Sequence, residues 1–421
     1  MHQEHPVKLV VEDDLGRTRL TVFFRLILAI PHFIFIFFWS IAVICASIVN
    51  WVATLVQGRP PAGLHRFMSS YVRYAAHLNA YLSLVGNPYP GFVGEEGEYP
   101  IDIVLPGPTE QPRWKTFFRI FLAIPALLLT TALGGTSNVR VPSRSQGGYS
   151  GGGSGALGAA VGVLGWFASM ARGRMPKGLR DAGAYSIGYS AQTLAFLLLV
   201  TDRYPNADPT AMLAGVERPP EHPVHLVGDA DDLRFSRATV FFRLPLVIPH
   251  LVWLALWSVL AILAAILTWF ATLFTGTPPA GLHRFLSRYV RYSLHVSAFL
   301  YLAANPFPGF VGEEGKYPLD LELPGPVRQN RWKTGFRIFL VIPAALVNSA
   351  LGGGLAVAAI CTWFVALATG AAPWGLRNFS AYALRYASQV SAYGFLLTGA
   401  YPHASPLEGA APAQLSFAEP A

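Results

Sequence analysis

Charged side chains are scarce in this chain, and their absence is concentrated in long stretches. Charged residues make up only 13% of the sequence and hydrophobic residues 53%, a balance that is unusual for a soluble protein. Residues 26–57 contain only His32 and Cys45 as titratable side chains, and residues 244–277 contain only His250. Such runs are typical of membrane helices, because hydrocarbon offers no hydrogen-bond partner to an open backbone. The sequence therefore excludes an ordinary soluble fold and predicts an all-α membrane protein.

Cysteine is nearly absent, and so are the common catalytic and metal-binding patterns. Cys45 and Cys361 both lie in apolar runs, which excludes a disulfide framework and a cysteine-based metal cluster. The sequence contains no nucleophile elbow, zinc-protease motif or pair of catalytic carboxylates. The Gly/Pro turns also lack the Lys followed by Ser or Thr that a phosphate loop requires. We therefore expect a protein that is not an enzyme and that has no metal and no cofactor.

Two motifs recur along the chain in a fixed order. FFRLILAIPH from Phe23 returns as FFRLPLVIPH from Phe241, and FFRIFLAIPA from Phe117 returns as GFRIFLVIPA from Gly335. A Trp-led segment that ends in a Gly/Pro turn follows each motif, as in WVATLVQGRPPAGLHRF. These segments begin at Trp51, Trp166, Trp269 and Trp363. The order predicts a repeated unit of a short strand segment, an apolar run, a turn and a second helix.

The repeats divide the chain into four tandem units, arranged as a two-unit block that occurs twice. We call these units copies one to four and expect them to form a helical bundle. Copy two carries a Gly/Ser-rich insert inside its apolar run, at about residues 135–155. The Ala/Pro content of the last residues predicts a disordered tail. The expected boundaries are 1–98, 99–215, 216–316 and 317–402 for the copies and 403–421 for the tail.

The insert bears on whether each apolar run is one helix or two. A membrane-spanning helix does not accept such an insert at mid-depth, so we expect turns at the matching points, near Trp39, Trp257 and Gly352–Gly354. Each run is then a hairpin of two short helices, with roughly eight crossings in all. Basic residues on both sides of the first run, such as Arg17 and Arg59, favour the hairpin, which places them on one side of the membrane. The alternative is one long tilted helix per run, with copy two as an exception.

An arginine begins every apolar run, and more arginines follow on the helix after the turn. The first group has two interpretations, an interfacial anchor that extends to the headgroups or a ligand for a lipid phosphate or other anion. The second group forms a polar stripe beside aromatic residues. This helix lies in the headgroup region as a basic amphipathic helix, or it crosses the membrane with its stripe facing the bundle interior. Lipid or anion contact is expected at Arg25, Arg119, Arg243, Arg337, Arg66, Arg73, Arg284, Arg288 and Arg291.

Histidine distinguishes the odd copies from the even ones. At the three histidine positions of copies one and three, copies two and four have Ala, Arg and Gln. The coordinated change suggests a proton or metal site in the odd copies, although divergence of paired copies with different neighbours also explains it. His65 and His77 lie twelve residues apart on one predicted helix, so they point about 120° away from each other. The residues of the proton or metal hypothesis are His32, His77, His250 and His295.

The combined motifs resemble those of a known family. The elements FR-x4-IP, W-x-A-x-L, G-x-x-P-x-G-L-H-R-F and Tyr-Pro are similar to those of a bacterial membrane-protein family, common in actinobacteria, that is known only as a domain of unknown function. The resemblance covers nearly all of residues 6–402, but copies two and four lack the His of GLHRF. It implies no substrate, cofactor or catalytic residue.

The composition favours a multi-pass protein of the cell membrane that binds or organises anionic lipid at the cytoplasmic face. A formal net charge of +8 suits contact with anionic headgroups, which makes membrane lipids the expected partners. Nucleic acid is not expected, because the basic residues are spread around helix ends and form no single patch. A transporter or channel built from internal repeats is the alternative, and a membrane enzyme acting on lipid is the third hypothesis.

Overall fold

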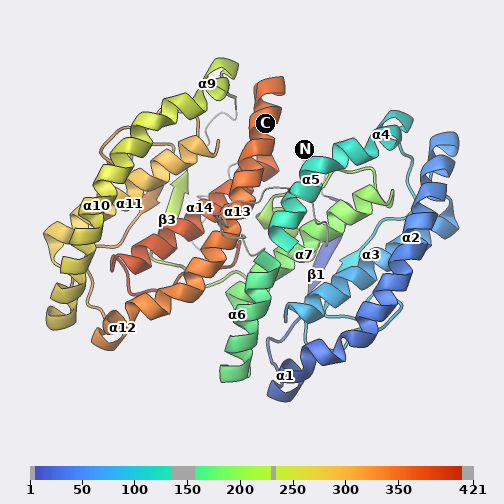
Figure 1. Ribbon diagram of the computed structural model, residues 1–421, viewed down its shortest axis with the longest axis horizontal. Helices are drawn as coiled ribbons and strands as arrows, with labels where there is room; N and C mark the ends of the chain where they lie inside the picture. Colours follow the sequence, from blue (N-terminus) through green and yellow to red (C-terminus); the bar gives the residue numbers. More distant parts are fainter. Residues whose placement is uncertain (1–4, 135–156, 229–233, 410–421) are drawn as a thin grey trace, which may run out of the picture. The chain divides into compact units, whose positions relative to one another are not determined.

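The chain folds into two compact parts, which we call the N-terminal half (Met1–Glu217) and the C-terminal half (Arg218–Ala421). The computed structural model describes residues 5–134, 157–228 and 234–409. Each half is considered by itself (Figure 1). The N-terminal half contains β1 (Lys8–Val11), α1 (Arg19–Leu28), α2 (Ile30–Gln57), α3 (Ala62–Leu82), β2 (Ile101–Val104), α4 (Arg113–Phe117), α5 (Arg119–Gly134), α6 (Leu157–Arg172), α7 (Lys177–Leu197) and α8 (Pro209–Met212). The C-terminal half contains β3 (His225–Gly228), α9 (Arg237–Phe241), α10 (Arg243–Thr275), α11 (Ala280–Leu300), β4 (Leu319–Glu322), α12 (Arg331–Gly335), α13 (Arg337–Thr369) and α14 (Trp374–Gly394).

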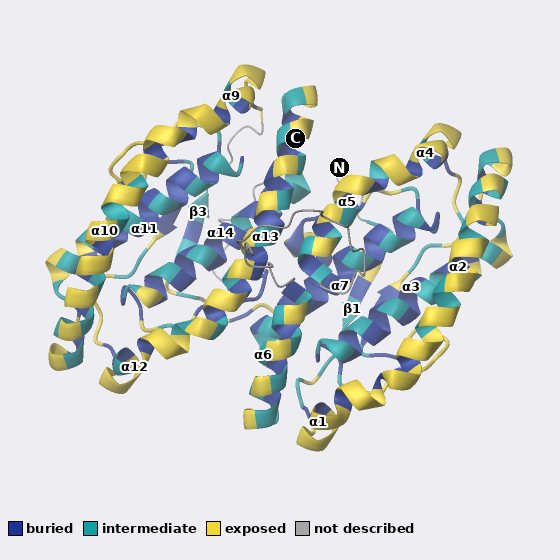
Figure 2. Ribbon diagram, in the orientation of Figure 1, coloured by how far each residue is buried: buried dark blue, intermediate teal, exposed yellow. Residues whose placement is uncertain are grey.

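Each half has two inner helices flanked by long apolar outer helices. The inner helices are α3 and α7 in the N-terminal half and α11 and α14 in the C-terminal half, each of 21 residues. The outer helices are α1–α2 and α5–α6 in the first half and α10 and α13 in the second (Figure 1). Figure 2 shows that buried residues gather on the inner helices and exposed residues on the outer ones. The core of each half is therefore the inner pair.

The outer helices expose apolar side chains over most of their surface. In α10 the buried positions Val247, His250, Ala261 and Ala264 form one narrow stripe, whereas large side chains such as Phe274 remain exposed. A helix that is apolar all round is stable against lipid or protein but not against water. In the part of the chain that the structure describes, three helical segments are long and apolar enough to cross a membrane, namely Arg19–Gln57, Arg243–Thr275 and Arg337–Thr369. Their length and composition indicate a membrane location.

The hairpin interpretation of the apolar runs is wrong. α2, α10 and α13 continue without a turn through Trp39, Trp257 and Gly352–Gly354, respectively. An unbroken helix satisfies its own backbone hydrogen bonds in apolar surroundings, so a turn at these points would leave polar groups unpaired. Among the described residues three helices have the length and composition of a span, in place of the roughly eight crossings expected with or without hairpins.

Copy two is the exception that the alternative interpretation allowed. Its apolar run is divided between α5 and α6, each of 16 residues, and the Gly/Ser-rich insert falls in residues 135–156, outside the described ranges. A Cβ atom on Gly158 would lie 2.6 Å from the carbonyl oxygen of Gly134, so the end of α5 touches the start of α6. In Figure 1, α6 continues the line of α5. Together they take the place of the single 33-residue α13.

The two copies in each half contact each other reciprocally. The Arg17 N–H donates to the Gly173 carbonyl at 2.9 Å, and the Gln111 N–H donates to the Gly58 carbonyl at 2.8 Å. The corresponding bonds of the C-terminal half join Phe235 to Gly370 and Gln329 to Gly276. The end of each outer helix therefore lies beside the segment that leads into the other one, so the two outer helices of a half run in opposite directions. Antiparallel pairing of β1 with β2 and of β3 with β4 also links the copies.

The predicted tail is only partly within the described residues. Residues 403–409 pack against α14, where the Tyr382 hydroxyl donates to the Ala404 carbonyl at 2.7 Å and Arg385 pairs with Glu408 at 2.8 Å. The rest of the predicted tail, residues 410–421, lies outside the described residues.

Candidate functional site

The arginine that begins each apolar run lies inside the protein. Its guanidinium group stacks on an aromatic ring near the end of an inner helix, with 4.0–4.2 Å between the guanidinium carbon and the ring centroid. This cation–π contact partly replaces the lost hydration of the charge. The exposed fractions are 3% for Arg25, 1% for Arg119, 1% for Arg243 and 3% for Arg337. The stacked pairs are Arg25 with Tyr81, Arg119 with Phe196, Arg243 with Phe299 and Arg337 with Tyr393.

These arginines meet the carbonyl ends of the inner helices. Arg25 donates to the carbonyls of Gly86 and Asn87 at 2.5 and 3.3 Å, just beyond the end of α3. The end of a helix carries partial negative charge on its unpaired carbonyls, so it stabilises a cation without a carboxylate. A leucine in the left-handed backbone region follows each inner helix and turns the chain there. These leucines are Leu84, Leu199, Leu302 and Leu396, with φ of 61°, 63°, 56° and 61°.

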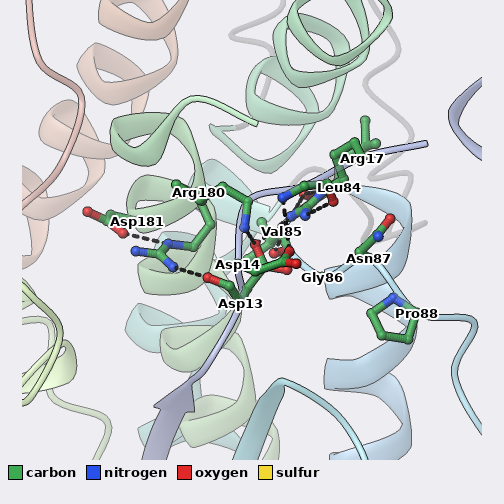
Figure 3. Close-up of polar contacts among 12 residues, drawn as sticks. Asp13, Asp14, Arg17, Leu84, Val85, Gly86, Asn87, Pro88, Arg180 and Asp181 are labelled. Atoms are coloured by element: carbon green, nitrogen blue, oxygen red, sulfur yellow. Dashed lines mark hydrogen bonds and ion pairs between the residues drawn. The ribbon is translucent and has the colours of Figure 1, made fainter. Parts of the chain in front are cut away.

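Arg17 is a second buried arginine at the end of α3, and it was not predicted as a site residue. Its Nη2 donates to the carbonyls of Leu84 and Val85 at 2.8 and 3.0 Å and pairs with Asp13 at 2.7 Å (Figure 3). Unlike Arg25, Arg17 has a buried carboxylate as its partner. Its charge is therefore neutralised within the protein.

Two glutamines form hydrogen bonds with arginines of this group, and they were not predicted as site residues. Gln111 accepts a hydrogen bond from Arg119 and donates to the Leu199 carbonyl at 2.7 Å. Gln329 accepts from Arg337 in the same way. In both halves the glutamine precedes the arginine by eight residues, and that constant spacing is the signal that would have identified them.

Arg25 and Arg337 each line a cleft. The cleft beside Arg25 has a volume of about 760 Å³ and is bordered by α1, α3, α5, α6 and α7. The cleft beside Arg337 has a volume of about 600 Å³ and is bordered by α10, α13 and α14. Both are walled by the start of one outer helix and the Trp-bearing part of the other, at Trp166 and Trp269 respectively. Such volumes are typical of small-molecule sites.

The Arg25 cleft combines an apolar wall with an incompletely paired cation. Nε and Nη1 of Arg25 are buried and have no hydrogen-bond acceptor among the residues that the structure describes. Over the same residues no carboxylate forms an ion pair with Arg25. Hydroxyl-bearing side chains such as Thr130 and Ser190 lie along the cleft between apolar ones. The chemistry suits an amphipathic anion.

The four histidines of the proton or metal hypothesis lie in two different environments, and each odd copy contains one histidine in each environment. His32 lies on α2, where its Nδ1 is 2.7 Å from the Tyr74 hydroxyl and its ring stacks on Phe92 at 4.4 Å. His250 has the same environment, 2.8 Å from the Tyr292 hydroxyl and 4.3 Å from the ring of Phe310. These rings are enclosed by aromatic side chains.

His77 belongs instead to a buried charged cluster. Its Nε2 lies 2.8 Å from Asp102 on β2, and Arg73 lies 3.5 Å from the same carboxylate and 3.1 Å from Glu96. Burial raises the pKa of the Asp102 carboxyl, but bonds from His77 and from the N–H groups of Gly97 and Ile103 outweigh it, so the pKa is lowered. The C-terminal half repeats the cluster with Arg291, His295, Glu314 and Asp320.

Asp102 and Asp320 were not predicted as partners of the histidines. Both stand at the second residue of the strand that follows an odd copy, in IDIV and LDLE, whereas β1 and β3 have no carboxylate within the strand. The joint presence of this aspartate and the histidine was the available signal.

The histidines do not converge on a metal site. Within residues 5–134, 157–228 and 234–409 no group of three or more His, Cys, Asp or Glu side chains is arranged to hold a metal ion. His65 bonds the Val200 carbonyl at 3.1 Å and His283 the Leu397 carbonyl at 3.4 Å, which places them in contacts between copies.

The basic stripe of the inner helices is divided between surface and interior. Arg66, Arg284 and Arg288 are exposed, so they are available to headgroups. Arg73 and Arg291 are 8% and 6% exposed and are engaged in the charged clusters.

Repeated helix units, exposed apolar outer helices and small two-stranded sheets define a mostly helical protein with a membrane location. Residues 19–93, 237–311 and 331–405 match the family described as Domain of unknown function (DUF4389). Since these matches cover more than half of its residues, the chain belongs to this family. The family repeats are three, not four, because residues 99–215 are not matched. No curated protein and no solved structure matches the chain.

Proposed function

We propose that this protein is a non-enzymatic membrane protein that binds anionic phospholipid in the clefts at Arg25 and Arg337. The observation that carries the proposal is the Arg25 guanidinium, buried at an apolar cleft with two nitrogens that have no acceptor among the described residues. A buried cation that is only partly compensated favours an anionic ligand.

The cleft walls support an acyl chain as the other part of the ligand. They continue into the exposed apolar faces of the outer helices, for example at Phe23 and Phe167, which are 59% and 62% exposed. A phospholipid can therefore place its phosphate at Arg25 while its chain stays in apolar surroundings. Arginine suits this role because its planar donors match phosphate oxygens.

The exposed arginines add a second, weaker contact. Arg66, Arg284 and Arg288 lie at the surface of the inner helices. Basic groups near an anionic leaflet contribute roughly 1 kcal/mol each. On this proposal they face the cytoplasmic leaflet, as the positive-inside tendency favours.

Lipid retention tests the proposal. The purified variants Arg25→Gln and Arg337→Gln should lose most of the anionic phospholipid that the wild-type protein retains, as measured by native mass spectrometry. Arg59→Gln, which removes the same charge from an exposed arginine, should retain it. Unchanged retention in the double variant Arg25→Gln, Arg337→Gln would contradict the proposal.

A second pair of variants leaves the buried arginines intact. Gly162→Leu and Gly394→Leu place side chains into the clefts, where the nearest atoms to a new Cβ are 3.6 and 4.0 Å away. They should displace lipid while the fold persists. Full retention in these variants would exclude the clefts as the site, even if the arginine variants fail to fold.

A further inference from the structure

The long apolar helices have three properties that bear on how each half meets the membrane. The first is length. α10 and α13 contain 33 residues each, which corresponds to roughly 50 Å of helix against roughly 30 Å of hydrocarbon. The tilt needed to fit such a helix across the bilayer exceeds the usual range.

The second property is the position of an acidic turn that follows each odd inner helix, at residues 93–98 in copy one and 311–316 in copy three. Glu96 pairs with Arg73, the twelfth of the 21 residues of α3, and Gly94 lies against the α3 backbone at Ser70 and Tyr74. A Cβ atom at Gly94 would be 2.6 Å from the Ser70 carbonyl oxygen. The turn is thus fixed at the middle of the helix.

The part of the outer helix that lies beside the middle of α3 is also the middle of the outer helix. The Ser40 hydroxyl is 2.8 Å from the Tyr71 hydroxyl, and Ser40 lies midway along the apolar segment Arg19–Gln57. The side chain of Glu96 is 62% exposed, and that of the matching Glu314 is 73% exposed. An outer helix that stood upright in the bilayer would place these carboxylates at hydrocarbon depth, where charges are costly.

The third property is that basic residues occur at both ends of the outer helices. In the N-terminal half, Arg19 donates to the Ala171 carbonyl at one end of the pair of outer helices. At the other end of the pair, Arg113 donates to the Val56 carbonyl. In the C-terminal half Arg237 contacts the end of α13 at Ala368, whereas Arg331 begins α12 next to the end of α10. An upright helix would place one basic cluster on each side of the membrane, against the positive-inside tendency.

The insert of copy two is consistent with the same orientation. α5 and α6 contain 16 residues each, and the sequence between them includes Arg140 and Arg144. Hydrocarbon does not accept a polar insert at mid-depth, but a helix lying near the membrane surface has water within reach along its whole length.

We propose that the outer helices of each half lie along the membrane plane, immersed in one leaflet, with both helix ends and the acidic turn facing water on the same side. The surface partner is a single leaflet of the bilayer. The apolar outer helices contact its acyl chains, and the basic helix ends contact its headgroups. This orientation does not depend on which lipid occupies the Arg25 cleft.

Sidedness of labelling tests the orientation. In a background with Cys45→Ala and Cys361→Ala, single cysteines are placed at the exposed positions Arg19, Glu96 and Arg59. A membrane-impermeant maleimide is then applied to right-side-out and to inside-out vesicles. All three positions should react in the same vesicle preparation and be protected in the other.

The C-terminal half provides an independent set at Arg237, Glu314 and Thr277, which are also exposed. The proposal would be overturned if the cysteines at positions 19 and 59, or those at positions 237 and 277, reacted in opposite preparations, because the outer helix would then cross the bilayer. Protection of the Glu96 or Glu314 position in both preparations would also contradict it.

Discussion

The inner helices of odd and even copies hold the neighbouring strand by different means. In α3 and α11 the contact joins an imidazole to a carboxylate, His77 to Asp102 and His295 to Asp320. In α7 the matching residue is Gln192, which donates to the Val7 carbonyl at 3.1 Å and accepts from the Asn206 N–H at 2.9 Å. One position of the fold therefore accepts either a charged cluster or neutral hydrogen bonds.

The difference shows which structural role the histidine of the odd copies has. The even copies complete the same packing without any titratable group at this position, since Gln389 repeats the contacts of Gln192 at 3.0 and 3.1 Å. The histidine–aspartate version occurs in the copies that carry the acidic turn, where Glu96 adds an exposed carboxylate to Arg73. It couples the strand and the turn to the inner helix through one set of charges.

The largest effect on this comparison is expected from Asp102→Asn. The variant leaves the buried Arg73 and His77 without their shared carboxylate, so the free energy of unfolding should fall by about 3 kcal/mol at neutral pH. Thermal or denaturant unfolding in detergent micelles measures it. Asp320→Asn should cause a similar loss in the C-terminal half, whereas Gln192→Ala, in an even copy, should cost only about 1 kcal/mol.

The pH dependence of the free energy of unfolding is the control for the effect of Asp102→Asn. Because the pKa of Asp102 is lowered in the folded protein, its contribution to stability is present above the ordinary aspartate pKa and is lost as the pH falls through the folded value. The difference between the wild type and Asp102→Asn should therefore be complete at pH 7 and shrink below about pH 4. A difference that stays constant into acid would show that the carboxylate charge is not responsible.

A smaller effect is expected when the two versions are exchanged. His77→Gln introduces the residue of the even copies and leaves Asp102 its bonds from Gly97 and Ile103 at 2.6 and 2.7 Å. Unfolding should become easier by only about 1 kcal/mol. Gln192→His, the reverse exchange in α7, should cost a similar amount because two backbone hydrogen bonds are lost. A cost for His77→Gln above that of Asp102→Asn would refute this ranking.

The sequence was sufficient for the features that depend on local pattern. The FR-x4-IP and Gly/Pro motifs located the start and end of the apolar helices, and the family match at 19–93, 237–311 and 331–405 confirms the unknown-function family as such. The insert misled the prediction, because copy two was taken as representative when it is the exception. α10 and α13 contain Pro249 and Pro343, and α13 also contains Gly352–Gly354, but both helices continue through these residues because an unbroken helix pairs its own backbone.

The arrangement of the sites depended on packing that the sequence does not encode locally. Arg25 was expected at the membrane surface or on a ligand, but its burial follows from the α3 carbonyl end and the Tyr81 ring that cover it. Arg25 and the Gly86 carbonyl belong to the same copy but are 61 residues apart, so the contact forms only when α1 packs against the end of α3. The partnership of His77 with Asp102 likewise spans 25 residues and a strand, so no spacing rule for a helix reveals it.

The most direct test of the account concerns which surfaces contact lipid and which contact water. Nitroxide labels at Phe38, which is 64% exposed on α2, and at Glu96 would be compared in lipid bilayers by their collision rates with oxygen and with a water-soluble nickel chelate. We predict that the Phe38 label is accessible to oxygen and shielded from the chelate, whereas the Glu96 label is accessible to the chelate. Access of the chelate to both labels, or to neither, would contradict an outer helix in lipid beside an acidic turn in water.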